Sequence, residues 1–75
     1  MDVQKIKEII AKYAKIDVAN LNEASDLKKD LHLDSIDLFQ IILDVENALG
    51  IKIPDSELLD IHTVKDALDK IKNAK

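Results

Sequence analysis

Hydrophobic residues recur at helical spacing over three stretches of the chain, and polar or turn-forming residues separate these stretches. The longest stretch lies between Ser35 and Leu49, where neither glycine nor proline occurs. We predict a helix that begins at Asp34 or Ser35 and ends at Gly50, which suits a left-handed C-terminal cap. Its face toward the core comprises Leu38, Ile41, Ile42, Val45 and Leu49.

Two further helices are predicted, one on each side of this segment. Asp2 can cap an N-terminal helix that ends around residues 14–16. Its apolar face comprises Val3, Ile6, Ile10 and Tyr13. Thr63 can cap a C-terminal helix together with Asp66, three residues later, in a capping-box arrangement. The buried face of that helix comprises Val64, Ala67, Leu68 and Ile71.

The connections between the helices differ in length. Residues 17–34 form a long loop that should be anchored on the bundle by Leu21, Leu27, Leu31 and Leu33. Pro54 prevents the middle helix from continuing. Residues 55–60 are predicted as one short turn of helix. Leu58, Leu59 and Ile61 should pack inward from it. The predicted fold is therefore all-α, a small antiparallel bundle of three main helices and one short helix.

The middle helix has a second hydrophobic stripe, which consists of Ile36, Phe39 and Leu43. As part of the core, this stripe would lie under the long loop. As part of the surface, it would form an apolar patch that partner proteins contact. The acidic residues that would surround such a patch are Asp37, Asp44 and Glu46. The residues alone leave these two interpretations open.

Length and composition narrow the class of protein. The chain of 75 residues has room for one domain, residues 1–75, with a small core. The absence of cysteine excludes disulfides and thiolate chemistry and suits a reducing cytosol. Residues 1–4 lack the features of a secretory signal, and no segment approaches membrane-spanning length. We expect a freestanding cytoplasmic monomer that does not insert into membranes.

Acidic residues are concentrated around Ser35. The formal net charge is -4, and residues 34–60 contain one lysine and seven acidic residues. Arginine is missing, which argues against nucleic-acid binding because that function needs a clustered basic face. A basic protein surface is the better partner, since opposite fields speed and orient the encounter.

Ser35 is the candidate functional residue, although its immediate neighbours permit several roles. The positive end of the helix dipole favours a phosphate ester there, whereas Asp34 and Asp37 oppose one. Taken alone, an Asp-Ser-Ile tripeptide is most often an ordinary N-cap. A serine hydrolase would need a Gly-x-Ser-x-Gly elbow, and Gly50 is the only glycine.

Metal binding and histidine chemistry have weak support. A calcium loop that starts at Asp30 would need glycine at its sixth position and glutamate at its twelfth, where this chain has Ser35 and Ile41. We therefore predict no metal site. His32 is interpreted as a loop residue and His62 as a surface or capping residue.

The run Asp30-Leu31-His32-Leu33-Asp34-Ser35-Ile36-Asp37 resembles the acyl carrier protein family. The usual run in that family is Asp-Leu-Gly-Leu-Asp-Ser-Leu followed by an acid. The resemblance continues through residues 49–55, which are similar to the family's loop after the second helix. It also includes Thr63-Val64, which is similar to the start of the family's last helix. It covers essentially the whole chain.

The resemblance implies that Ser35, flanked by Asp34, carries 4'-phosphopantetheine, whose thiol holds acyl groups as thioesters, and that the chain itself catalyses nothing. It implies as partners a phosphopantetheinyl transferase and acyl-transfer or synthase enzymes with basic docking surfaces. It favours Ile36 and Phe39 as contacts for them. Fatty acid biosynthesis is the expected pathway. The alternatives are a polyketide or other secondary pathway, or an unmodified helical interaction module.

Four positions depart from the family pattern. His32 replaces the usual glycine, and histidine tolerates a left-handed backbone better than most residues. Gln40, Asn47 and Lys52 stand where fatty-acid carriers often have acids, so this face is less negative.

Overall fold

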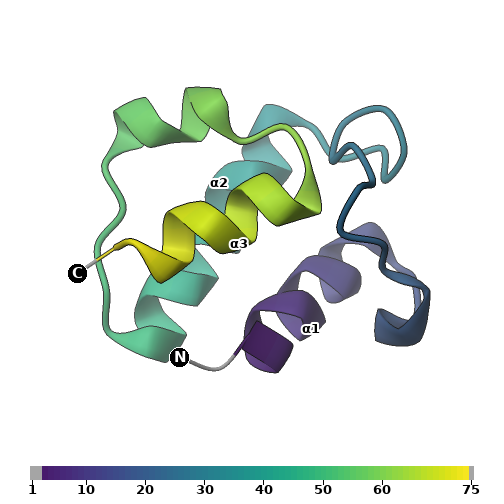
Figure 1. The fold of residues 1–75 in the computed structure, drawn as a ribbon, viewed down its shortest axis with the longest axis horizontal. Coiled ribbons are helices and arrows are strands. Elements are labelled where there is room, and N and C mark those ends of the chain that lie inside the picture. The colour runs from purple at the N-terminus through teal and green to yellow at the C-terminus, as the bar shows by residue number, and fades with distance from the viewer. Residues whose placement is uncertain (1–2, 75) are drawn as a thin grey trace.

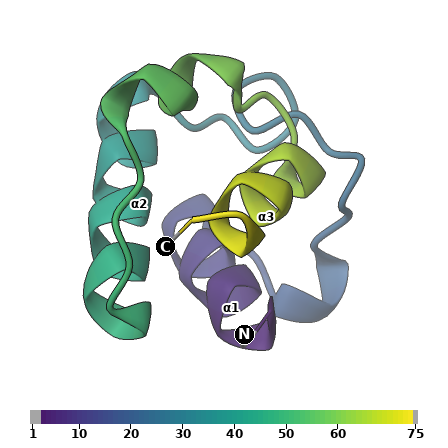
Figure 2. The same cartoon turned by 60° about the vertical axis from the view of Figure 1, so that its left-hand side comes forward.

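The structure is a computed structural model that describes residues 3–74. The elements in chain order are α1 (Val3–Ala14), η1 (Val18–Asn20), α2 (Ser35–Leu49), η2 (Asp55–Asp60) and α3 (Val64–Lys72), where η marks a 3₁₀ helix. The three α-helices pack together, and η2 spans the gap between α2 and α3 (Figures 1 and 2). The predicted all-α bundle with a long loop between its first two main helices is confirmed. The predicted cap at Asp2 lies outside the described residues.

The core is built from every helix and from the long loop. Leu27 and Leu33 are buried loop anchors, whereas Leu21 and Leu31 are partly buried against the core. The buried residues of the helices include Ile6, Ile10, Ile41, Ile42, Val45, Val64, Ala67, Leu68 and Ile71. Within residues 3–74, no polar or charged residue is buried. The inward stripes predicted for α2 and α3 are thus confirmed, and hydrophobic burial is the main stabilising contribution.

The long loop is bonded to the start of α3. The N–H of Leu27 donates to the carbonyl of His62 at 2.8 Å, and the N–H of Val64 donates to the carbonyl of Ser25 at 3.1 Å. Thr63 caps α3 and forms the predicted capping box with Asp66. These bonds fix the loop that leads to Ser35 against the third helix, so the two segments form one joint.

Two carboxylates stabilise this joint. The N–H groups of Lys29 and Lys28 donate to Asp26 at 2.8 and 2.9 Å, and the pKa of Asp26 is lowered mainly by these bonds. The N–H groups of Thr63 and His62 donate to Asp66 at 3.1 Å and lower the pKa of its carboxyl. Bonds of this kind favour the ionised carboxylate, so both residues strengthen the joint in their charged form.

Backbone conformation agrees with the expected turns. Gly50 has φ 67° and caps α2 in the left-handed region, as predicted. His32 has φ 59°, so the position where the family has glycine does require a left-handed backbone. Histidine occupies that region at some cost in strain.

The inward packing predicted for Leu59 is wrong. Its side chain is 79% exposed, whereas Ile61 is buried and Leu58 is partly buried. The reason is the three-residue period of η2, which places positions 58 and 61 on one face and position 59 away from it. The short turn therefore adds a hydrophobic side chain to the surface.

Candidate functional site

Ser35 is the first residue of α2, and Asp34 is its N-cap. The N–H of Asp37 donates to the Asp34 carboxylate at 2.8 Å, and the N–H of Asp34 donates to the Asp37 carboxylate at 3.2 Å. This reciprocal capping box provides acceptors for two main-chain N–H groups at the start of α2 without the Ser35 side chain. The N-cap of α2 is therefore Asp34 and not Ser35, which is consistent with the predicted helix start at Asp34 or Ser35. The Ser35 side chain is exposed.

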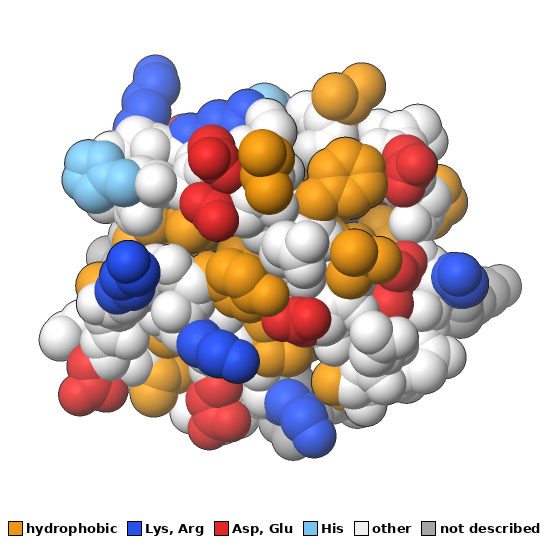
Figure 3. Space-filling view, turned by 180° about the vertical axis from the view of Figure 1, so that it is seen from behind, with side chains coloured by type: hydrophobic (Ala, Val, Ile, Leu, Met, Phe, Trp, Pro, Cys, Tyr) orange, Lys and Arg blue, Asp and Glu red, His pale blue; other side chains and the backbone are white. Residues whose placement is uncertain are grey.

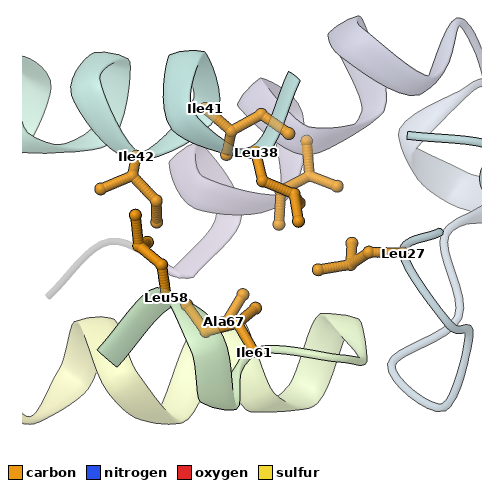
Figure 4. A pocket seen from close by; sticks show the side chains of 8 residues that line it. Leu27, Leu38, Ile41, Ile42, Leu58, Ile61 and Ala67 are labelled. Atoms are coloured by element: carbon orange, nitrogen blue, oxygen red, sulfur yellow. The ribbon is translucent and has the colours of Figure 1, made fainter. Parts of the chain in front are cut away.

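A groove of about 420 Å³ opens beside Ser35, between α2 and η2. Its apolar wall comprises Leu38, Phe39, Leu58, Leu59 and Ile61. Leu38, Leu58 and Ile61 also line a small space of about 10 Å³ in the core (Figure 4). In that view Leu38 extends from α2 toward Leu58 of η2 and Ile61, which follows η2. These three residues therefore border both the groove and the space in the core.

The groove also has polar walls. They comprise Lys28, Asp55, Ser56 and His62. Lys28 comes from the long loop and His62 from the segment before α3, so the joint described above brings both of them to the groove. Sequence reasoning did not assign a role to either side chain beside Ser35. Their proximity depends on the pairing of two distant segments, which no local motif signals.

The second stripe of α2 lies on the surface. Ile36 is 72% exposed, Phe39 47% and Leu43 46%, so these three residues, here called the α2 patch, are not additional core. Leu59 of η2 lines the same groove as Phe39. Hydrophobic side chains and acidic ones lie side by side on the rear face of the molecule (Figure 3). Exposed apolar groups with a charged surround are typical of a protein contact surface.

The acidic residues predicted around this patch also form internal hydrogen bonds. The Tyr13 hydroxyl donates to Asp44 at 2.6 Å, and this bond, more than any other influence, raises the pKa of Tyr13. The N–H of Ile53 donates to Glu46 at 2.8 Å and holds the chain after Gly50 against α2. The Tyr13–Asp44 bond spans 31 positions and the Ile53–Glu46 bond spans seven, so charge spacing along α2 alone indicates neither role.

Two findings bear on other kinds of site. Among the described residues, no group of three or more histidine, cysteine, aspartate or glutamate residues is arranged to hold a metal ion. None of the helices within residues 3–74 is both long enough and apolar enough to span a bilayer.

Residues 4–71 match the protein family described as "Phosphopantetheine attachment site". The chain is 42% identical over 69 residues to the acyl carrier protein of Lactobacillus acidophilus, which covers 92% of this chain and 86% of that protein. The chain is similar to a solved structure of acyl carrier protein from Enterococcus faecalis, with a TM-score of 0.79 and 30% sequence identity. The superposition covers 97% of this chain and 92% of the Enterococcus faecalis chain. An apo doublet acyl carrier protein from prodigiosin biosynthesis gives the same TM-score at 32% identity, covering 97% of this chain and 35% of the doublet.

Fold and site together define a carrier domain that holds its cargo on a prosthetic group. The chain belongs to the acyl carrier protein family. Members are carriers and not catalysts, and they bear a covalently attached 4'-phosphopantetheine group. Their partners are phosphopantetheinyl transferases, acyl transferases and synthases. An exposed hydroxyl at a helix start, with two basic side chains in the adjacent groove, fits the phosphodiester of such a group.

Proposed function

We propose that Ser35 is the attachment site of 4'-phosphopantetheine and that this chain carries acyl intermediates for fatty acid biosynthesis. The observation that carries the proposal is the Asp34–Asp37 capping box, which leaves the Ser35 hydroxyl exposed at the helix start. A serine used as the cap would instead hold its oxygen against the backbone. Asp34 thus acts as the flanking residue that keeps the hydroxyl accessible.

When bound, the group supplies a terminal thiol that holds the acyl cargo as a thioester. The protein's own residues serve recognition. Ile36 and Phe39 provide apolar contact area on the α2 patch. The acidic side chains beside them attract basic docking surfaces. Asp37, Asp44 and Glu46 contribute to this field while they also hold α2 in place.

The fatty-acid assignment is supported by the acyl carrier protein that is 42% identical over most of this chain. A second candidate is a carrier for a secondary pathway, because a similarly folded relative comes from prodigiosin biosynthesis. We expect a monomer, one domain over residues 1–75, and a cytoplasmic location for either role.

Reconstitution separates the two pathways. The loaded protein is mixed with the malonyl transferase, ketosynthase, reductases and dehydratase of a bacterial fatty acid synthase, and the acyl group is read by mass spectrometry. We expect successive two-carbon elongation and full reduction to saturated long chains. The Ser35→Ala variant is the control and should carry none. Malonyl loading without elongation would favour the secondary pathway.

A further inference from the structure

The polar lining of the groove includes two basic residues, Lys28 and His62, whose main chains form hydrogen bonds. The N–H of Lys28 donates to Asp26 at 2.9 Å. The N–H of His62 donates to Asp66 at 3.1 Å, and its carbonyl accepts the N–H of Leu27 at 2.8 Å. These bonds use only main-chain atoms of the two residues, so both side chains stay available to the groove that Ser35 also lines.

A phosphodiester on Ser35 would be repelled by nearby carboxylates, and the side chains of Lys28 and His62 can offset this repulsion. The phosphodiester adds a negative charge beside Asp34 and Asp37. Residues 34–60, which include both, contain seven acidic residues and one lysine. Carboxylates this close oppose the new charge, and the helix dipole compensates for only part of that repulsion. Lys28 and His62 come from outside residues 34–60. Lys28 brings a positive charge to the groove, and His62 brings a ring N–H donor.

Asp55 is the one acidic residue among the groove-lining side chains of residues 3–74, and it comes from η2. Asp66 and Asp26 do not line the groove, and their pKa values are lowered mainly by main-chain N–H groups and also by His62. His62 therefore lies close to both carboxylates.

We propose that Lys28 and His62 bind the phosphodiester attached to Ser35 and so hold the first segment of the arm between α2 and η2. The Lys28 ammonium and a ring N–H of His62 donate to non-bridging phosphate oxygens in charge-assisted hydrogen bonds. This inference rests on the proposed attachment at Ser35. It adds a phosphate-binding role for two residues that lie outside the serine motif.

A thermodynamic cycle tests this role without any measurement of acyl transfer. Apo and fully loaded forms are prepared for the wild type, Lys28→Met and His62→Gln, and loading is verified by intact mass. The matched controls are Lys29→Met, which changes the same charge one residue away but outside the groove, and His32→Asn, which tolerates the left-handed backbone. Each variant gives one number, its loaded-minus-apo melting temperature.

We expect this difference to fall by about 2–5 °C in Lys28→Met and His62→Gln, and to stay at the wild-type value in both controls. High salt should shrink the gap between the variants and the wild type because it screens exposed charges. Phosphorus-31 relaxation gives an independent readout. The phosphate should move more freely in the two groove variants than in the controls.

Equal temperature differences and equal phosphate mobility in the groove variants and the controls would overturn the inference. The proposed function would then still stand, because every variant had accepted the group. If the wild type itself takes no group, both the proposed function and this inference fail.

Discussion

The hydroxyl of Tyr13 donates a hydrogen bond of 2.6 Å to the carboxylate of Asp44, across 31 positions of sequence. The bond joins α1 to α2 in a partly buried place. The sequence predicts Asp44 among the acidic residues around the α2 patch, and the structure shows that its side chain also links two helices. A substitution at Asp44 therefore changes stability as well as surface charge.

Removal of the Tyr13 hydroxyl should destabilise the bundle. Because the bond raises the pKa of Tyr13, its stabilisation is fully present below about pH 10, the pKa of free tyrosine, and is lost as pH rises further. Urea unfolding at pH 7 and at pH 10.5 should show a larger alkaline loss for the wild type than for Tyr13→Phe. Equal losses in both proteins would mean that the bond does not contribute to folding.

The joint between the long loop and α3 should weaken in acid. The pKa of Asp66 is lowered by the N–H groups of Thr63 and His62, so its contribution is present above about pH 4, the value for a free aspartate, and is lost as pH falls through the lowered pKa. Asp66→Asn keeps an acceptor without the charge and should flatten the fall in stability between pH 6 and pH 3. Asp69→Asn, an exposed position on the same helix, is the control and should keep the wild-type slope.

Local sequence rules predicted much of this fold. The capping box at Thr63, the left-handed cap at Gly50 and the buried leucines of the long loop depend on nearby residues and on burial of apolar surface, and all were confirmed. The outward turn of Leu59 was missed because a short 3₁₀ segment and an α-turn give different faces to the same sequence.

The sequence predicted only part of the candidate site. The motif around Ser35 singled out the hydroxyl, and its position at the start of α2 agrees with that choice. The Tyr13–Asp44 bond and the approach of Lys28 and His62 to the groove are products of tertiary packing, and no spacing rule predicts them.

The α2 patch makes a clear prediction for Phe39. Since this ring is 47% exposed, Phe39→Ala should lower the free energy of unfolding by less than about 1.5 kcal/mol, against about 2–5 kcal/mol for the buried Leu68→Ala. Affinity for a phosphopantetheinyl transferase should fall at least tenfold, as expected for a central aromatic contact. Ile16→Ala, which truncates an exposed residue outside the patch, should bind normally. Normal binding by Phe39→Ala would remove the patch from the docking surface.

Charge at the start of α2 should steer partners. Asp37→Asn retains an acceptor for the capping box, and we expect it to lower the association rate severalfold at low ionic strength. The variant and the wild type should converge near 1 M salt, where the screening length is about 3 Å. Stopped-flow binding to the transferase measures the association rates of the variant and the wild type. Asp69→Asn, which removes the same charge elsewhere on the surface, is the control. A defect that is independent of salt would exclude steering by Asp37.

Attachment at Ser35 is the central claim, and intact mass spectrometry tests it most directly. The purified chain is incubated with coenzyme A and a promiscuous phosphopantetheinyl transferase. The wild type, Ser25→Ala and Ser56→Ala should each gain one phosphopantetheinyl group. Ser35→Ala should gain none while keeping its helical circular dichroism, since Asp34 still caps α2. Ser56 is the sharpest control because it lines the same groove. A mass gain by Ser35→Ala, or a group mapped to Ser25 or Ser56, would contradict the account.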